Sequence, residues 1–211
     1  MSTARPSKRR RSEILEAAVD VIAERGICET RIADVARRAG MSAALVLYYF
    51  DSKDRLLTEA LTHAEDRFYL SAFHDLNSAP RAADRLVRLI DRSFPARGGE
   101  DAGDWKLWIE LWSRALRDPE VARKREALDR RWRETIAGVV REGQREGDFA
   151  DVDAEAFALR FASLMDGLAI QAVLGDPEGG ADTVRDICLE MAARELKFEP
   201  VAAAGRSSGR E

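Results

Sequence analysis

The stretch TRIADVARRAGMSAALVLYYFDSK, residues 30–53, contains two short helical patterns separated by a Gly-Met-Ser break. Apolar residues recur at helical spacing after Thr30, and this pattern ends at Gly40. Ser42 is a good N-cap for a second helix that ends near Tyr49. Two helices joined by a short turn containing glycine are typical of a helix-turn-helix, whose second helix enters the DNA major groove. A plain helical hairpin has the same local pattern, so these residues alone leave both interpretations open.

Helical periodicity extends over most of the remaining chain, and alternating strand patterns are almost absent. Ser12 is expected to cap a first helix, which Gly26 ends. The sequence therefore predicts an all-α fold with about nine helices. Their expected ranges are 13–25, 31–40, 42–49, 53–77, 80–94, 104–117, 119–146, 153–174 and 182–198.

Charge is distributed unevenly along the chain. Residues 1–53 contain ten Lys and Arg against seven Asp and Glu, whereas the whole chain has 34 against 38. A basic front on an acidic body indicates that only the front meets a polyanion. The segment RPSKRRR, residues 5–11, could follow the phosphate backbone or enter the minor groove. The alternative is a solvated tail that adds only non-specific affinity.

Composition excludes several classes of protein. Cys28 and Cys188 lie far apart, which fits neither a disulfide framework nor metal-ligand spacing, and a reduced cytoplasmic setting is expected. No apolar run approaches 18 residues, so no membrane span is expected. The sequence shows no nucleophile–base pair and no glycine-rich phosphate loop, so neither an enzyme nor a bound cofactor is expected.

Residues 12–60 carry a specific set of motifs: the helix ended by Gly26, the run T-x-x-x-I/V-A-x-x-A-G-x-S from Thr30, and the ending YYF-D-S-K followed by Leu56-Leu57. In these features the segment resembles the DNA-binding domain of the TetR family of bacterial regulators. Residues 80–196 resemble the BetI-type C-terminal domain in the runs WKLWIELWSRALRDPEV and ASLMDGLAIQAVLG. The resemblance implies a DNA-binding domain and a larger helical regulatory and dimerisation domain. The expected limits are a basic flexible arm at 1–11, the DNA-binding domain at 12–52, the regulatory domain at 53–198 and a disordered tail at 199–211.

The resemblance also assigns DNA contacts. Phosphate contacts are expected from hydroxyl and amino groups, and the apolar side chains of the recognition helix offer contacts to thymine methyl groups. Arg31 is the best candidate for a guanine contact, so we expect specificity to rest on Arg31, methyl contacts and DNA shape. The usual family ending YYHF reads LYYF here. One tyrosine ring could instead join the small core, an alternative that applies more to Tyr48 than to Tyr49. The predicted contact residues are Thr30, Arg31, Ser42, Ala43, Ala44, Leu45, Leu47, Tyr48, Tyr49 and Lys53.

A helix-turn-helix this small reads few base pairs, and a dimer on a near-palindrome is the usual solution. In TetR-like proteins the last two helices form a four-helix bundle with those of the partner. The alternative is that these apolar faces are buried within one subunit. The predicted interface residues are Phe157, Leu164, Leu168, Val184, Ile187 and Met191.

Three of the four tryptophans fall on one side of the helix expected at 104–117. Such a stripe is commonly core, but in TetR-like proteins the body encloses a ligand cavity, and tryptophans would suit an aromatic or cationic compound. Further polar candidates to orient a ligand are Glu110, Arg114 and Asp166. The predicted ligand-binding residues are His63, Trp105, Trp108, Trp112, Phe161, Met165 and Gln171.

The sequence as a whole predicts a homodimeric, cytoplasmic transcriptional regulator of bacterial type. It is expected to be a repressor that an unidentified small-molecule effector releases from a palindromic double-stranded DNA operator. The competing hypothesis is an all-α interaction adaptor or enzyme that binds no DNA. An adaptor would not explain a basic head that carries Tyr48, Tyr49 and Lys53.

Overall fold

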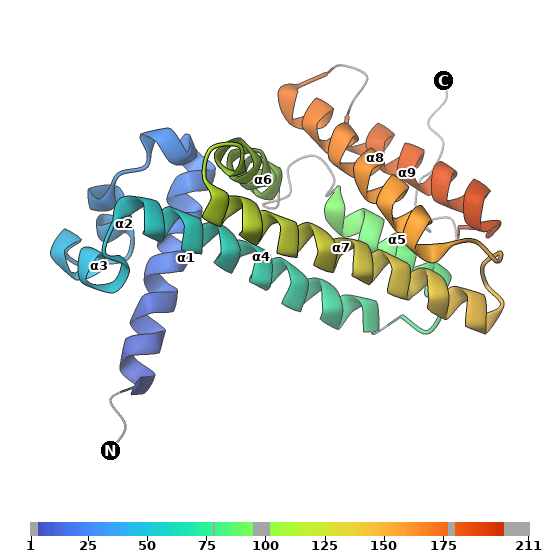
Figure 1. Cartoon of the computed structure of the whole chain (residues 1–211), viewed down its shortest axis with the longest axis horizontal. Helices are drawn as coiled ribbons and strands as arrows, with labels where there is room; N and C mark the ends of the chain where they lie inside the picture. Colours follow the sequence, from blue (N-terminus) through green and yellow to red (C-terminus); the bar gives the residue numbers. More distant parts are fainter. Residues whose placement is uncertain (1–3, 78, 95–101, 177–179, 201–211) are drawn as a thin grey trace, which may run out of the picture. The chain divides into compact units, whose positions relative to one another are not determined.

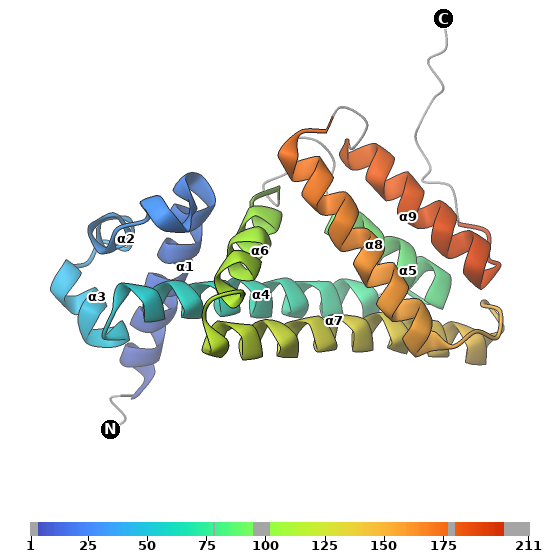
Figure 2. The same ribbon diagram turned by 45° about the horizontal axis from the view of Figure 1, so that its top comes forward.

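A computed structural model of the chain describes residues 4–77, 79–94, 102–176 and 180–200. Over these ranges the chain forms helices and no strand (Figures 1 and 2), which confirms the predicted all-α class. The expected tail at 199–211 lies outside the described residues from position 201 onward. The helices are α1 (Ala4–Glu29), α2 (Ile32–Arg38), α3 (Ala43–Phe50), α4 (Lys53–Asn77), α5 (Ala82–Ser93), α6 (Ala102–Ala115), α7 (Pro119–Glu146), α8 (Ala154–Leu174) and α9 (Ala181–Leu196).

The first helix begins earlier than expected. Ser12 lies inside α1 and does not cap it, and residues 4–11 are helical where a flexible arm was predicted. Lys and Arg are good helix formers, and Pro6 falls in the first turn, where its missing N–H costs no helical hydrogen bond. Arg9 Nε also lies 3.1 Å from Glu13 Oε1, one helical turn further on.

The turns of the helix-turn-helix follow the sequence closely. Gly26 interrupts α1 with φ +79°, and Gly40 has φ +65° between α2 and α3, a conformation that glycine adopts without strain. Ser42 caps α3 by accepting a hydrogen bond from the Leu45 amide at 3.2 Å. Ser52 likewise accepts from the Arg55 amide at 3.2 Å at the start of α4. Both caps were expected from the sequence.

The chain folds into two compact units. The first unit contains Met1–Ala72 and Arg97–Arg131, and the second contains Phe73–Ala96 and Trp132–Glu211. The division expected from the family, at residue 52, separates DNA binding from regulation and stays a prediction. In the structure, α6 and the first part of α7 belong to the same unit as the helix-turn-helix.

In the first unit, the inner faces of α1, α2, α3 and α4 form one core. Ile14, Val35, Val46 and Phe50 have no exposed surface. Helix α6 packs against α1 and adds Leu107 and Leu111 to this core. The helix-turn-helix head, formed by α1, α2 and α3, therefore shares one apolar core with the tryptophan-bearing α6.

In the second unit, α9 packs against both α5 and α8. Phe149, in the turn after α7, packs near Phe198, with ring centroids 5.1 Å apart. The backbone of Gly143 lies directly beneath the Phe149 ring, so close that a Cβ there would overlap the ring atoms. Only glycine fits at this position beneath the ring.

By length and mean hydropathy (1.4), α8 is the helix among the described residues that could cross a membrane. Core helices of soluble proteins pass the same test. Phe157, Phe161 and Met165 are fully buried against neighbouring helices of the second unit. Asp153 caps α8 by accepting from the Ala156 amide at 2.9 Å, and Gly175 ends it with φ +80°. We therefore assign α8 to the helical core.

Candidate nucleic-acid interface

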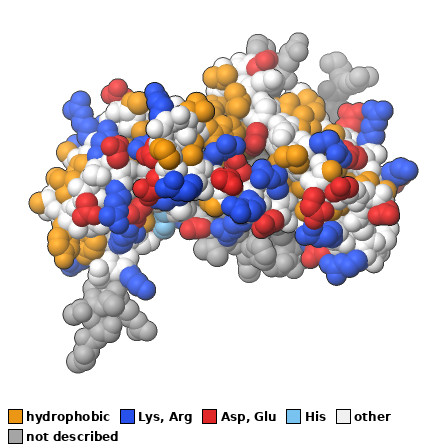
Figure 3. Space-filling model, viewed as in Figure 1, with side chains coloured by type: hydrophobic (Ala, Val, Ile, Leu, Met, Phe, Trp, Pro, Cys, Tyr) orange, Lys and Arg blue, Asp and Glu red, His pale blue; other side chains and the backbone are white. Residues whose placement is uncertain are grey.

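Helix α3 is anchored by two fully buried side chains, while the others keep part or most of their surface exposed. Val46 and Phe50, one turn apart, are fully buried. Ala43 and Ala44 are exposed, Leu45 is half-buried, and Leu47 retains 41% of its surface. In Figure 3, hydrophobic side chains gather at the left edge of the molecule, over α3. A short helix with an apolar outer face beside charged surface is suited to contact the methyl-bearing edge of DNA bases.

The two tyrosines have different environments. Tyr48 is 79% exposed, whereas Tyr49 is half-buried and packs against the head core. Their rings meet edge to face with centroids 5.5 Å apart. Of the two tyrosines, Tyr49 is therefore the one whose ring joins the core. The sequence favoured Tyr48 for this role, and that expectation was wrong. Tyr48 presents its hydroxyl to solvent.

The remaining predicted contacts fall into two groups. Arg31, which precedes α2, is exposed. Lys53, the first residue of α4, places its Nζ 3.4 Å from the carbonyl oxygen of Cys28. Thr30, in contrast, is 1% exposed and its hydroxyl donates to the Gly26 carbonyl oxygen at 2.7 Å. The structure does not support a phosphate contact from the Thr30 side chain. Its hydrogen bond to Gly26 instead stabilises the kink at Gly26 and the link to α2.

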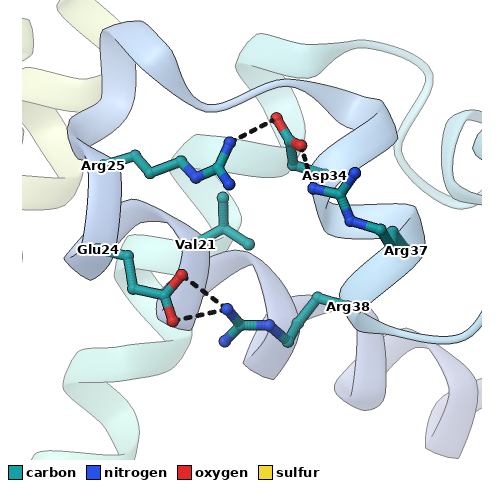
Figure 4. Close-up of a pocket in the computed structure, with 6 residues that line it drawn as sticks. All are labelled: Val21, Glu24, Arg25, Asp34, Arg37 and Arg38. Carbon is teal, nitrogen blue, oxygen red and sulfur yellow. Dashed lines mark hydrogen bonds and ion pairs between the residues drawn. The ribbon is translucent and has the colours of Figure 1, made fainter.

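Ion pairs that the sequence analysis did not identify hold α2 against α1. Asp34 lies 2.5 Å from Arg37 Nη2 and 3.4 Å from Arg25 Nη1, and Arg38 reaches Glu24 at 2.6 Å. Figure 4 shows these side chains lining a surface pocket of about 300 Å³, where three arginines face two carboxylates. Hydrogen bonding from Arg38 lowers the pKa of Glu24. The sequence shows charged residues at helical spacing on α1 and α2. It does not show that these two faces pack against each other.

The predicted ligand-binding residues are divided between the two units. His63 and the α6 tryptophans belong to the first unit, and Phe161, Met165 and Gln171 to the second. Phe161 and Met165 are fully buried and Gln171 is exposed.

In the first unit, the tryptophans are half-buried. Trp108 packs against the head core, as the core interpretation expected, and its ring lies 6.1 Å from that of Trp112. The indole Nε1 of Trp112 and the Nε2 of His63 are both buried without a hydrogen-bond partner among the described residues. Burial lowers the pKa of His63, and Glu16 Oε1 lies 4.0 Å from its Nε2. A buried polar group without a partner is costly, so these two groups are suited to meet a bound molecule.

Two of the polar candidates serve other contacts. Arg114 Nη2 lies 3.2 Å from Asp54 Oδ1, which links α6 to the first turn of α4. Glu110 lies beside Gly26, at 3.4 Å from where a Cβ would stand. Asp166 of α8 is half-buried and also interacts with neighbouring groups.

The predicted dimer residues differ in exposure. Phe157 and Val184 have no exposed surface within the single chain, so the structure does not support a partner contact for them. They pack the second unit from within. Ile187 is 39% exposed, and Leu164, Leu168 and Met191 are half-buried. These four side chains retain surface on α8 and α9.

Comparison with known proteins decides the family. Residues 14–60 match the model for bacterial regulatory proteins of the tetR family, and residues 82–197 match the BetI-type transcriptional repressor C-terminal domain. The chain belongs to the TetR family. The TetR-family assignment confirms the resemblance inferred from the motifs. TetR-family proteins are DNA-binding transcriptional regulators and not enzymes, which removes the competing hypothesis.

Individual relatives agree with this assignment. The chain is 27% identical to the HTH-type transcriptional regulator BetI of Cronobacter sakazakii over 190 residues, 89% of this chain and 91% of that protein. A putative transcriptional regulator from Saccharomonospora viridis, solved in complex with choline, is 33% identical with a TM-score of 0.80, covering 89% of this chain and 96% of its own. A putative TetR-family regulator from a Rhodococcus species is 26% identical with a TM-score of 0.77, covering 90% and 99%.

Proposed function

We propose that this TetR-family regulator is a dimeric repressor that leaves a palindromic operator when a small organic cation binds. Because its target is chromosomal DNA, it acts in the bacterial cytoplasm. The observation that carries the DNA-binding part is Tyr48, which is 79% exposed on a helix anchored by the fully buried Val46 and Phe50. An exposed phenol in this position can donate to a phosphate oxygen while its ring packs on a sugar. Arg31, Ser42, Ala43, Ala44, Leu45, Leu47, Tyr49 and Lys53 complete the proposed interface.

The direct test is selection of duplexes from a random pool, followed by binding of the enriched fluorescent duplex across a salt series. We expect enrichment of a near-palindrome and an affinity that falls with salt, with a slope of about −0.9 per phosphate neutralised. Equal binding to all sequences would contradict sequence-specific repression. Replacing Arg31 with Ala should relax the preference for guanine at one position in each half-site.

Dimerisation is proposed through the surface of α8 and α9 that carries Leu164, Leu168, Ile187 and Met191. These side chains keep apolar surface in the single chain, and burying it in a partner subunit would be favourable. Sedimentation should show a dimer that Ile187→Arg converts to a monomer. Leu116→Arg is the matched control, because Leu116 is 87% exposed at the end of α6. A dimer that survives Ile187→Arg would contradict this surface.

For the effector, we propose a quaternary ammonium compound bound beside the α6 tryptophans. The support is the half-buried pair Trp108 and Trp112, whose ring faces attract cations, together with the choline present in the Saccharomonospora relative. Trp105 and His63 are proposed to border the same site.

Choline titration, followed by intrinsic fluorescence and by release of the selected duplex, tests this proposal. Trp112→Leu should weaken choline binding by about 1–2 kcal/mol, and Trp112→Phe should weaken it less, since phenylalanine keeps an aromatic face. Absence of choline binding would remove this effector class and leave the DNA-binding proposal intact. Release of DNA further requires that choline bind the released conformation more tightly than the DNA-bound one.

A further inference from the structure

A cluster of charged side chains surrounds the C-terminal end of α3. Arg11 of α1 lies over the ring of Phe50, with the guanidinium carbon 4.7 Å from the ring centroid, and forms an ion pair with Glu59 of α4. Glu59 also accepts from Arg55 Nε at 3.2 Å, and Arg55 reaches Asp51 at 2.5 Å. Because Asp51 follows Phe50 directly, these five residues form a closed circuit through α1, α3 and α4.

The circuit meets α3 where its backbone is least regular. Asp51 ends the helix with φ +58° and ψ −37°, a positive-φ conformation that a non-glycine residue rarely adopts. Contacts from neighbouring groups must maintain such a conformation. Val46 and Phe50 are the fully buried side chains of this eight-residue helix, so contacts at its C-terminal end help to fix its angle to α1 and α4.

We propose that Arg11 and Glu59 are positioning residues for base recognition. They hold α3 at the angle at which its side chains contact bases, and they do not touch DNA themselves. Glu59 is central because its one carboxylate binds two arginines, and its side chain is only 19% exposed. Arg11 differs from Lys8, Arg9 and Arg10, whose side chains are exposed along α1. Of this basic run, Arg11 is the residue held against the head. The inference rests on the proposed sequence-specific DNA binding.

Glu59→Gln separates positioning from simple electrostatics, because the two roles predict opposite effects. Removing a negative charge from a DNA-binding head should strengthen binding to every duplex. Loss of positioning should weaken binding to the selected duplex alone, by about tenfold for one misplaced base contact. The probes are the duplex enriched from a random pool by the wild-type chain and a scrambled duplex of equal length and composition.

Glu13→Gln is the matched control. It removes the same charge from an ion-paired glutamate of α1, but Glu13 pairs with Arg9 and lies outside the circuit. We expect Glu59→Gln to lose about tenfold in the ratio of selected to scrambled affinity, and Glu13→Gln to keep the wild-type ratio. Circular dichroism at the assay temperature verifies that each variant is folded.

Arg11→Lys provides a second, milder variant, since lysine keeps the charge but lacks the planar fork that pairs with a carboxylate. A reduced ratio with an unchanged salt slope on scrambled DNA supports positioning. Retention of the ratio in both Glu59→Gln and Arg11→Lys would overturn the inference, as would an equal loss in Glu13→Gln. A wild-type chain that enriches no sequence would instead overturn the proposed function.

Discussion

Helices α3 and α8 are both built largely from apolar residues, yet they use them differently. In α8, Phe157, Phe161 and Met165 are fully buried in the core of the second unit. In α3, Val46 and Phe50 are buried while Leu47 and Tyr48 face solvent. Both helices are mainly apolar in sequence. The eight-residue α3, however, has only two fully buried side chains and leaves others, such as Leu47 and Tyr48, in solvent. An apolar helix therefore indicates core where it is long and covered, and a binding surface where it is short and uncovered.

The largest effect should come from the buried face of α8. Phe161→Ala should lower the free energy of unfolding by about 3–5 kcal/mol, because it removes a fully buried ring and leaves a cavity. Leu174→Ala, at an exposed position of the same helix, should cost no more than about 0.5 kcal/mol. Urea unfolding measures both. A small cost for Phe161→Ala would mean that the ring borders an open cavity, as the ligand prediction for Phe161 required.

On α3, the expected effect falls on binding and leaves stability unchanged. Tyr48→Ala should weaken binding to the selected duplex by about 1 kcal/mol, the usual worth of one hydrogen bond, roughly fivefold in affinity. The midpoint of thermal unfolding should not change, since Tyr48 is 79% exposed. Fluorescence anisotropy and calorimetry provide the two readings. If Tyr48→Ala destabilised the fold and left DNA binding intact, the contrast between α3 and α8 would fail.

Acid should affect the two units in separate pH windows. Burial lowers the folded-state pKa of His63 below its ordinary 6.5, so its neutral form stabilises the first unit above that pH, and this contribution is lost as pH falls through the folded pKa. In the second unit, the hydrogen bond from Arg81 lowers the pKa of Asp148, whose contribution is lost only below 3.8. Hydrogen exchange should show α4 weakening first.

His63→Gln is the control for the first of these windows, because glutamine does not titrate. The loss of protection in α4 between pH 6.5 and the folded pKa should then disappear. Persistence of the same loss in His63→Gln would show that another group is responsible.

The smallest expected effect is on the chemical reactivity of the two cysteine thiols. Burial raises the pKa of Cys188, in α9 beside α8, to about 12, whereas Cys28 is exposed. Iodoacetamide at pH 8 should therefore modify one thiol in the native protein and both in urea, as counted by mass spectrometry. Cys28→Ser should abolish native labelling. Rapid native labelling of Cys188 would show that the α8–α9 pair opens readily.

Much of the head could be predicted from residues 26–53, because caps and turns are local signals. Ser42, Gly26 and Gly40 perform the expected roles. Properties that depend on distant neighbours were not predictable. The inward ring of Tyr49 and the buried hydroxyl of Thr30 depend on packing that local sequence does not reveal.

The same limit applies to the candidate site. A helical wheel places Phe157 and Val184 on apolar faces, but does not tell whether the same chain or a partner covers those faces. The circuit through Arg11 and Glu59 joins residues 48 positions apart, and no sequence spacing indicates it. Ion pairs between distant helices become visible only when the packing is known.

The close approach of Gly143 to the ring of Phe149 has a consequence for how related sequences can diverge. Any side chain at position 143 requires a smaller one at position 149, because a Cβ would overlap the ring. The two positions should therefore change together among relatives, with alanine at 143 accompanied by loss of the aromatic ring at 149. A side chain gained at position 143 while the ring at 149 remains would be removed by selection for a folded protein.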